Sequence, residues 1–328
     1  MKIDFVITWV DGSDEEWLAE KKEFFPETDT DPKRFRDWDI LKYWFRGVEK
    51  FAPWVNKIHF ITWGHLPEFL NVDHPKLNIV RHEDYLKEDY YPTFNSNAIE
   101  LSMHQIKGLA EHFVYFNDDM FIIKEVEKED FFENGLPKDV AILTPIVPKE
   151  YDSISGIMLN NIGLINNNFS FRDSFKKDWK KWLNYRYKQL LPLNLLFQPW
   201  SSVVGLYQQH LPSSFLKSTF AEVWEKEGKY LDETSKRKKR DNKKDVNQWL
   251  FKQWLVMQGK FEPRNISFGK YIMIKNKESI EQLKKAQNNT ATKMVCLNDH
   301  VEDNLDEVIT NVKTEMNKIL NEKSQFEI

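Results

Sequence analysis

Three short apolar segments, each followed directly by polar residues, constrain the fold of this chain more than any other feature. They are IDFVITWV (3–10), KIHFITWG (57–64) and HFVYFN (112–117). Runs of this length that are rich in Val, Ile and Phe are typical of strands buried on both faces. Segments with helical spacing lie between them. This alternation of strand and helix predicts an α/β fold built on a mainly parallel, doubly wound sheet.

The two segments between the strands are expected to be helices. DWDILKYWFRGVEKFAPW (37–54) repeats apolar residues at helical spacing as far as Pro53, and NSNAIELSMHQIKGLAEH (95–112) begins with Asn95 or Ser96 as its cap. Doubly wound sheets bind ligands beyond the carboxyl ends of their strands. All three polar clusters fall at those ends, so the sequence predicts a site there.

The middle and the end of the chain are expected to be largely helical. Residues 171–191 carry an aromatic face, which could serve as a platform for an acceptor or an anionic membrane surface, but packing on the chain's own core is favoured. Helices are expected on both sides of a basic loop within 221–260. A further amphipathic helix is expected around LDEVITNVKTEMNKIL (305–320).

Composition narrows the classes of function. A net charge of −4 argues against a nucleic-acid binder. The single cysteine, Cys296, can form no internal disulfide, which fits a reducing cytoplasm. The first apolar run is interpreted as a strand rather than a signal peptide, and no segment approaches the ~18 apolar residues of a membrane span. Aromatic residues (14%) favour a well-packed core or a surface that stacks against sugars.

The third strand ends in an amide and two carboxylates, Asn117, Asp118 and Asp119. Asn and Asp form turns, which is the simpler explanation. Adjacent carboxylates after a strand also resemble the motif by which nucleotide-sugar enzymes hold Mg²⁺ or Mn²⁺ against a diphosphate, because hard cations prefer oxygen ligands.

Two further polar segments near the N-terminus are candidates for nucleotide contacts. In TWVDGSD (8–14), Asp11 or Asp14 could accept hydrogen bonds from ribose or uracil while Gly12 brings backbone close to a ligand, and the alternative is a capped turn before a helix. In RFRDWD (34–39) the default interpretation is a salt-bridge run, and a phosphate-binding arginine, Arg34 or Arg36, is the functional one.

The segment SKRKKRDNKKDVNQWLF (235–251) is strongly basic. Such a run is usually a solvated loop, and the lack of aromatic residues inside it argues against RNA binding. Arg240, beside an Asp- and Asn-rich helix start, could instead stabilise charge on a transferring phosphate. His210, in QQHLPSSF, is compatible with acid–base chemistry.

Taken in order, these segments resemble the four conserved regions of the Stealth proteins. The matching stretches are IDFVITWVDGSDEEW, RFRDWDILKYWFRGVEKFAPWVNKIHFITWGHLPEFLN, PTFNSNAIELSMHQIKGLAEHFVYFNDDMF, and HLPSSFLKS followed by TSKRKKRDNKKDVNQWLFKQW. MVCLND and EKSQFE resemble the family's C-terminal pattern. Stealth proteins are bacterial capsular and exopolysaccharide sugar-1-phosphate transferases, related to the animal enzyme that starts the mannose-6-phosphate tag on lysosomal hydrolases.

The resemblance implies a Rossmann-like core of the GT-A type. It implies transfer of a sugar-1-phosphate from a UDP-sugar, often UDP-N-acetylglucosamine, to a hydroxyl of a polysaccharide or lipid-linked glycan, with Mg²⁺ or Mn²⁺ as cofactor and UMP as the leaving product. It also suggests work in the cytoplasm at the inner face of a bacterial membrane. The rival functions are an ordinary glycosyltransferase that releases UDP and a non-catalytic glycan-binding protein.

The resemblance also implies roles for particular residues. By position, the catalytic residues are Glu100, Asp119, His210 and Arg240, with Arg237 as the alternative to Arg240 and either His210 or Glu100 as the base. Asp118 and Asp119 would hold the metal. The substrate- and nucleotide-binding positions are Asp11, Gly12, Arg36, Asp37, Asn117, Asp245 and Asn247.

One catalytic domain, 1–328, is expected to have four parts. These are an α/β nucleotide-sugar core (1–150), a helical insertion (about 151–200), a segment that completes the active site (about 201–275) and a helical tail (about 276–328).

Overall fold

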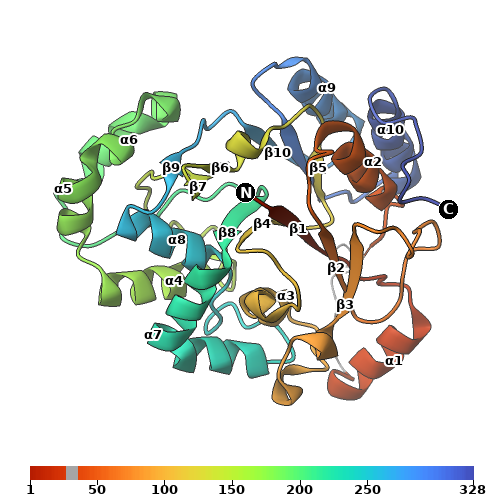
Figure 1. Cartoon of the computed structure of the whole chain (residues 1–328), viewed down its shortest axis with the longest axis horizontal. Helices are drawn as coiled ribbons and strands as arrows, with labels where there is room; N and C mark the ends of the chain where they lie inside the picture. The colour runs from red at the N-terminus through yellow and green to blue at the C-terminus, as the bar shows by residue number, and fades with distance from the viewer. Residues whose placement is uncertain (27–35) are drawn as a thin grey trace.

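The computed structural model describes residues 1–26 and 36–328 of the chain (Figure 1). A five-stranded sheet lies at the centre, in the order β3-β2-β1-β4-β8. Its strands are β1 (Ile3–Thr8), β2 (Ile58–Thr62), β3 (Leu77–Arg81), β4 (His112–Phe116) and β8 (Ser213–Leu216). The first four strands in the order run parallel, and β8 pairs antiparallel with β4. The predicted α/β fold with a mainly parallel sheet is therefore confirmed.

The central strand β1 is buried on both faces, as its apolar run predicted. Ile3, Phe5 and Ile7 pack into one hydrophobic cluster, whereas Val6 packs into the other. Successive side chains of a strand point to opposite faces, so a strand covered on both sides must be apolar at nearly every position. Asp4 is the exception, and three hydrogen bonds, from Asn56, His59 and the backbone of Ala110, compensate for its burial.

One face of the sheet is covered by helices and by a second, smaller sheet. The helices are α2 (Leu41–Phe51), α9 (Ile280–Asn288) and α10 (Leu305–Asn317). The second sheet has the order β10-β11-β5 and comprises β5 (Met120–Ile122), β10 (Gly269–Ile274) and β11 (Met294–Asp299). Since β4 ends at Phe116 and β5 begins at Met120, the three polar residues between them join the two sheets.

The other face is covered by helices from the middle of the chain. They include α3 (Ser96–Leu101), α4 (Ser155–Asn168), α5 (Phe171–Trp182), α7 (Lys217–Lys236) and α8 (Trp249–Gln258). The rings of Phe220 in α7 and Phe251 in α8 stack 3.6 Å apart. The remaining elements are α1 (Glu15–Phe24), α6 (Leu191–Phe197), β6 (Phe132–Glu133), β7 (Leu136–Asp139) and β9 (Glu262–Pro263).

Several predicted elements differ from the structure. The helix expected over 95–112 is only α3, capped by Asn95 as predicted, followed by a short 3₁₀ turn (Met103–Gln105). The segment 276–328, expected to be a helical tail, contains the strand β11. On α5, Phe171 and Trp182 are buried while Trp179 is 51% exposed, so this face packs mainly on the core.

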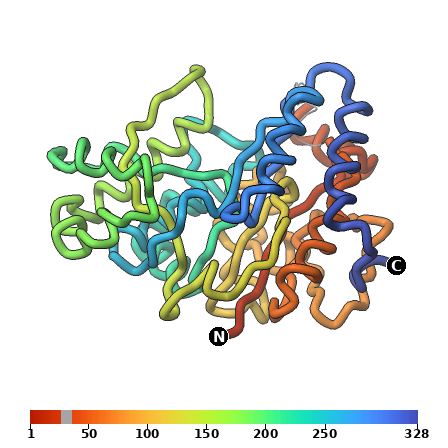
Figure 2. The backbone as a smooth tube through the Cα atoms, turned by 90° about the horizontal axis from the view of Figure 1, so that it is seen from above, coloured from red at the N-terminus to blue at the C-terminus, as the bar shows by residue number. Residues whose placement is uncertain are grey.

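The beginning and the end of the chain lie side by side. Figures 1 and 2 both show α10 beside α2. Arg46 in α2 pairs with Glu327, with 2.7 Å between guanidinium and carboxylate, and Tyr43 donates to the carbonyl of Lys313. The C-terminal segment therefore packs against the same core as the N-terminal part of the chain. Among the described residues, no helix combines the length and apolar composition needed to cross a membrane.

Candidate active site

The polar ends of the central strands meet at one edge of the sheet, as their order predicted. Asn117, Asp118 and Asp119 follow β4 and Asp11 follows β1, which runs parallel beside β4. His210 arrives from the opposite direction, because β8 is antiparallel to β4 and places Ser213 opposite Tyr115. The residues just before β8 therefore lie beside the residues just after β4.

Asp119 is the centre of this group. Its Oδ2 lies 3.6 Å from Nε2 of His210 and accepts hydrogen bonds from Sγ of Cys296 (3.1 Å) and Nδ2 of Asn298 (3.2 Å). Its Oδ1 is buried and has no hydrogen-bond partner among the described residues. Burial opposes ionisation of Asp119, but these neighbours outweigh it and lower its pKa. Asp119 is thus held as a carboxylate with one oxygen unsatisfied, which suits a cation.

His210 is the accessible member of the group. Its side chain is 32% exposed, and its Nε2 also lies 3.5 Å from Nδ2 of Asn117. Its ring and that of Tyr271 pack edge to face. Burial lowers the pKa of His210, but the carboxylate of Asp119 more than offsets this, and the net pKa is raised. The carboxylate of Asp119 therefore stabilises the imidazolium that forms when His210 takes up a proton.

β11 supplies residues that the sequence did not identify as part of the site. It pairs antiparallel with β5, with Cys296 opposite Met120. Cys296 and Asn298 are two residues apart on a strand and so face the same side, toward Asp119. Tyr271 on β10 donates to Oδ1 of Asn298 at 2.9 Å. The motif MVCLND was recognised in the sequence, but only the pairing of β11 with β5 gives these two side chains a role.

Negative charges gather around Asp119. Asp118 and Asp37 are both exposed. Partial loss of water, and then repulsion from Asp119 and Asp37, raises the pKa of Asp118. Partial loss of water, and then repulsion from Asp39 and Asp11, raises the pKa of Asp37. A divalent cation would relieve this repulsion. The residues present therefore fit Mg²⁺ or Mn²⁺ held by oxygen atoms.

Cys296 and His210 also lie close enough to Asp119 to hold a metal, since their ligand atoms are within 4.8 Å of one another. A metal bound by this trio would need a thiolate. However, the thiol of Cys296 donates its hydrogen bond to Asp119, and burial together with that carboxylate raises the thiol's pKa well above the ordinary value. The arrangement favours Cys296 as a hydrogen-bond donor that orients Asp119.

Glu100 lies deeper than the rest of the group. It is only 7% exposed and accepts a hydrogen bond from the hydroxyl of Tyr115 (3.3 Å), which in turn lies 3.0 Å from Oγ1 of Thr8. Burial raises the pKa of Glu100 to about 7, although Arg240 and Tyr115 oppose the shift. So little exposed surface leaves Glu100 poorly placed to touch an acceptor, and its effect on the site is through Arg240 and His210.

Arg240 is held at the start of α3. Its guanidinium bonds to Oγ of Ser96, and the charge of Glu100, one turn further along the same helix face, attracts it. Arg240 is half-buried. Its cationic group therefore lies between the helix start and the Glu100 carboxylate.

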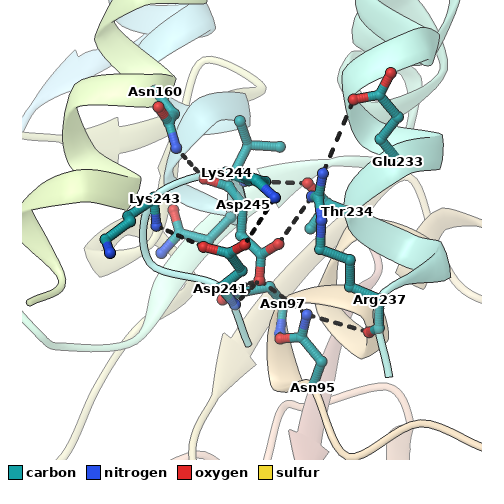
Figure 3. A network of polar contacts seen from close by, with 12 residues as sticks. Asn95, Asn97, Asn160, Glu233, Thr234, Arg237, Asp241, Lys243, Lys244 and Asp245 are labelled. Carbon is teal, nitrogen blue, oxygen red and sulfur yellow. Dashed lines mark hydrogen bonds and ion pairs between the residues drawn. The ribbon is translucent and has the colours of Figure 1, made fainter. Parts of the chain in front are cut away.

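A buried network fixes the loop that carries Arg240 (Figure 3). Asp245 has no exposed surface and binds Nη1 of Arg237 at 3.0 Å. It also accepts hydrogen bonds from the side-chain amides of Asn95 (2.9 Å) and Asn97 (3.2 Å) on the α3 cap. Arg237 is thus occupied in holding the loop against α3. This favours Arg240 over Arg237 as the arginine of the site.

Three predicted ligand-binding residues make contacts within the protein, and direct contact with substrate stays a prediction for them. Asp245 makes the contacts with Arg237, Asn95 and Asn97 described above. Asn247 is 5% exposed, and it both donates a hydrogen bond to Asn161 and accepts one from it. Arg36 forms a bidentate ion pair with Asp299, in which Nε donates to Oδ2 at 2.8 Å and Nη2 donates to Oδ1 at 2.9 Å. Arg34 lies outside the described residues.

The turn after β1 is a capped turn, the structural alternative expected for TWVDGSD. Oδ1 of Asp11 accepts from the backbone and hydroxyl of Ser13, and Oδ1 of Asp14 accepts from the backbone of Trp17 to cap α1. The backbone N–H of Asp11 donates to Nε2 of His65 at 2.7 Å. Gly12 lies in this turn, and contact with a nucleotide stays a prediction for Asp11 and Gly12.

Comparison with known protein families matches the N-terminal part of the chain to two sequence profiles. The profile of Stealth protein conserved region 1 matches residues 1–24, and that of conserved region 2 matches residues 34–139. Together they include the ends of β1 and β4 that meet at Asp119.

Similarity to characterised proteins extends over the whole chain. The capsular polysaccharide phosphotransferase WcwK of Streptococcus pneumoniae is 45% identical over 334 residues, covering 99% of this chain and 98% of that protein. The receptor polysaccharide phosphotransferase WefC of Streptococcus oralis is 39% identical, with coverages of 100% and 99%. The exopolysaccharide phosphotransferase cps2G of Lactiplantibacillus plantarum is 38% identical, with coverages of 99% and 96%.

Among solved structures, the galactosyltransferase LgtC in complex with donor and acceptor sugar analogues matches with a TM-score of 0.41 at 8% identity, over 98% of both chains. The bifunctional glycosyltransferase WbbM matches with a TM-score of 0.37 at 12% identity, over 98% of this chain and 52% of that one.

Proposed function

The chain belongs to the Stealth family and is a phosphotransferase, and we propose that it transfers a sugar-1-phosphate from a UDP-sugar to a hydroxyl of a capsular or exopolysaccharide acceptor. UMP would leave and a phosphodiester would form. The arrangement around Asp119 carries the proposal: an ionised carboxylate with one unsatisfied oxygen lies beside an accessible histidine at the carboxyl edge of a parallel sheet.

Asp118 and Asp119 would hold the metal in this proposal. Mg²⁺ or Mn²⁺ bound there would neutralise charge on the diphosphate of the donor. The unsatisfied Oδ1 of Asp119 and the repulsion that raises the pKa of Asp118 support this assignment.

The chain's own residues would orient the reaction and move its proton. An acceptor oxygen would form a bond to the β-phosphorus, and the bond from that phosphorus to the oxygen shared with the α-phosphate would break. Arg240 would offset charge on the transferring phosphoryl group, where a planar guanidinium fits two oxygens. His210 would receive the acceptor's proton, because it is exposed to solvent whereas Glu100 is not.

Replacing His210 with Ala tests its role as proton acceptor. We expect turnover to fall by about 10²–10⁴-fold, the usual contribution of a general base. Binding of the UDP-sugar, measured by calorimetry, should be unchanged, because His210 is assigned to the acceptor. His112→Ala is the matched control, since His112 begins β4 at the opposite edge of the sheet. Unchanged turnover in His210→Ala would remove the assignment.

The raised pKa of Glu100 predicts a pH dependence of activity. With a pKa of about 7, Glu100 gains its negative charge between about pH 6 and 8, and this charge attracts Arg240 and His210. We therefore expect kcat to rise with pH through about 7. Glu100→Gln should shift this limb to lower pH, because the charge of Glu100 contributes to the raised pKa of His210. A limb that keeps its position in the variant would show that Glu100 does not control it.

Glu100→Gln should also stabilise the protein at alkaline pH. A carboxyl whose folded pKa lies above its unfolded value contributes stability that is present at low pH and lost as pH rises through the folded pKa. For a pKa of about 7 against the ordinary 4.5, this loss is about 3 kcal/mol by pH 9. The variant should therefore unfold at a higher temperature than wild type at pH 9, and the difference should vanish near pH 4.

We further propose work in the cytoplasm at the inner face of a bacterial membrane, on a polymeric or lipid-linked acceptor. The helices α5 and α6, at the far left of Figure 1, support a peripheral contact. Trp179, Leu195, Leu196 and Trp200 there are each more than half exposed. Basic side chains accompany them in the sequence, at Lys176, Lys177, Lys180 and Lys188, as in surfaces that bind anionic lipid.

The experiment that tests the proposed function follows the β-phosphate. UDP-N-acetylglucosamine labelled with ³²P in the β-position is incubated with the protein, Mg²⁺ and an acceptor polysaccharide. Sugar-1-phosphate transfer carries the label into the polysaccharide. Label that stays with the nucleotide while sugar enters the polysaccharide would instead establish a glycosyltransferase.

A further inference from the structure

Arg264, between β9 and β10, is a buried cation with no negative partner in the part of the chain that the structure describes. It is 8% exposed, and Nη1 and Nη2 donate only to neutral oxygens, the carbonyl of Pro212 (3.4 Å) and the hydroxyl of Ser214 (3.0 Å). Its Nε is buried, and no described residue offers it a hydrogen-bond partner. Within residues 1–26 and 36–328, no carboxylate lies at ion-pair distance from this guanidinium.

This burial needs a compensating charge. A guanidinium stays protonated in proteins, and a buried charge is unfavourable unless it is paired. The ring of Phe268, 5.0 Å from Cζ of Arg264, supplies only a weak attraction. Asp139 and Asp130 attract Arg264 from a distance, but Oδ1 of Asp139 is bound by Nζ of Lys252 at 3.1 Å and by the backbone of Val140 at 2.7 Å, and Oδ2 of Asp130 is bound by Nζ of Lys293 at 2.7 Å.

Arg264 lines a small pocket together with a second cation. The pocket lies between Asp139, Tyr207, Gln209, Lys252 and Arg264, and it has room for one water-sized particle. Two positive groups and one negative group leave a net charge of +1 there. A neutral water could accept a hydrogen bond from Nε but would leave that charge in place.

We propose that this pocket binds a small monovalent inorganic anion, of the size and charge of chloride, as the counter-ion of Arg264 and Lys252. The site is separate from the Asp119 group, and the inference does not depend on the proposed transferase activity. It lies behind the segment that carries His210, because Gln209 and Leu211 line it and Arg264 bonds to Pro212. The bound anion would thus stabilise the approach to β8.

Thermal unfolding in matched salts tests the proposal. The full chain is unfolded in sodium gluconate, and chloride then replaces gluconate at constant ionic strength. We expect a saturable rise in Tm of about 4 °C when chloride reaches about 100 times its dissociation constant, from the linkage relation and the unfolding entropy of a chain this long. Bromide should act like chloride. Sulfate, which is larger and divalent, should give no saturable rise, only the gradual rise that an excluded kosmotropic salt causes in any protein. Equal Tm values in chloride and gluconate would mean that the pocket holds water only and would overturn the proposal.

Variants locate the effect in the pocket. Lys252→Met removes one cation and should abolish the chloride-dependent rise in Tm, while Lys252→Arg should keep it. Lys138→Met is the matched control, because Lys138 pairs with Glu133 on the neighbouring strands without lining the pocket. If Lys252→Met responds to chloride as wild type does, the anion binds elsewhere and the proposal is wrong.

Discussion

Asp119→Asn is expected to lower the rate of sugar-phosphate transfer by at least about 10³-fold, the scale of losing a principal electrostatic group in a metal-assisted site. The change keeps the shape of the side chain but removes the charge that faces His210 at 3.6 Å and that would hold the metal. Steady-state kinetics at saturating Mg²⁺ measure the loss.

The stability of Asp119→Asn distinguishes a catalytic role from a structural one. Because the folded protein favours the ionised form of Asp119, the variant should not gain stability, and we expect it to remain folded by circular dichroism. Asp73→Asn, at an exposed loop position, is the matched control and should keep full activity. A variant at Asp119 that retains more than about a tenth of wild-type turnover would contradict the account of the site.

Arg240→Met is expected to reduce turnover by about 10³-fold, the lower end of the effect of an arginine that stabilises a transferring phosphoryl group. The guanidinium contacts Ser96 at the start of α3 and is only half-buried, so its removal should leave the fold intact. UMP release should therefore become slower by this factor, while the melting temperature should stay close to that of wild type.

Arg237→Met is the matched comparison, because it removes the other candidate arginine from the same loop. Asp245 would lose its cationic partner while fully buried, which should destabilise the protein by about 3 kcal/mol. We expect a lower Tm with turnover per folded molecule largely retained. If Arg237→Met loses turnover at full stability while Arg240→Met is active, the two roles must be exchanged.

The parts of the fold that the sequence predicted are those with a local signature. β1, β2 and β4 are continuous apolar runs, as strands covered on both faces must be, and their polar ends mark the edge where Asp11 and Asp118 lie. By contrast, β3 (Leu77–Arg81) is an outermost strand of the sheet. It is largely half-buried and mixes polar with apolar residues, so its sequence carries no comparable signal.

The pairing of distant strands could not be read from the sequence. β5 is three residues long and pairs with β11, which begins at Met294, so the contact of Asn298 and Cys296 with Asp119 spans almost 180 positions. No local pattern specifies such a register. His210 was identified through the family resemblance, but its approach to Asp119 depends on β8 being antiparallel.

The burial of particular charged residues also could not be predicted from the sequence. Asp245 and Glu100 were assigned to the site by the family resemblance, and because acidic residues are seldom buried, nothing in the sequence indicates that both lie inside the protein. The structure shows that Asp245 binds Arg237, Asn95 and Asn97 inside the protein. Glu100, on α3, is 7% exposed and accepts a hydrogen bond from Tyr115. A carboxylate that is paired, or whose pKa is shifted, can be recognised only when the positions of its neighbours are known.

The most direct measurement of the central claim is the identity of the nucleotide released. The purified protein is incubated with Mg²⁺, a panel of UDP-sugars and a capsular oligosaccharide acceptor, and the nucleotides are separated by chromatography. The account predicts UMP that appears only with acceptor, in equal amount to the phosphodiester formed, and that is lost in Asp119→Asn. Acceptor-dependent release of UDP would contradict it, since the sugar–phosphate bond would then be the one that breaks.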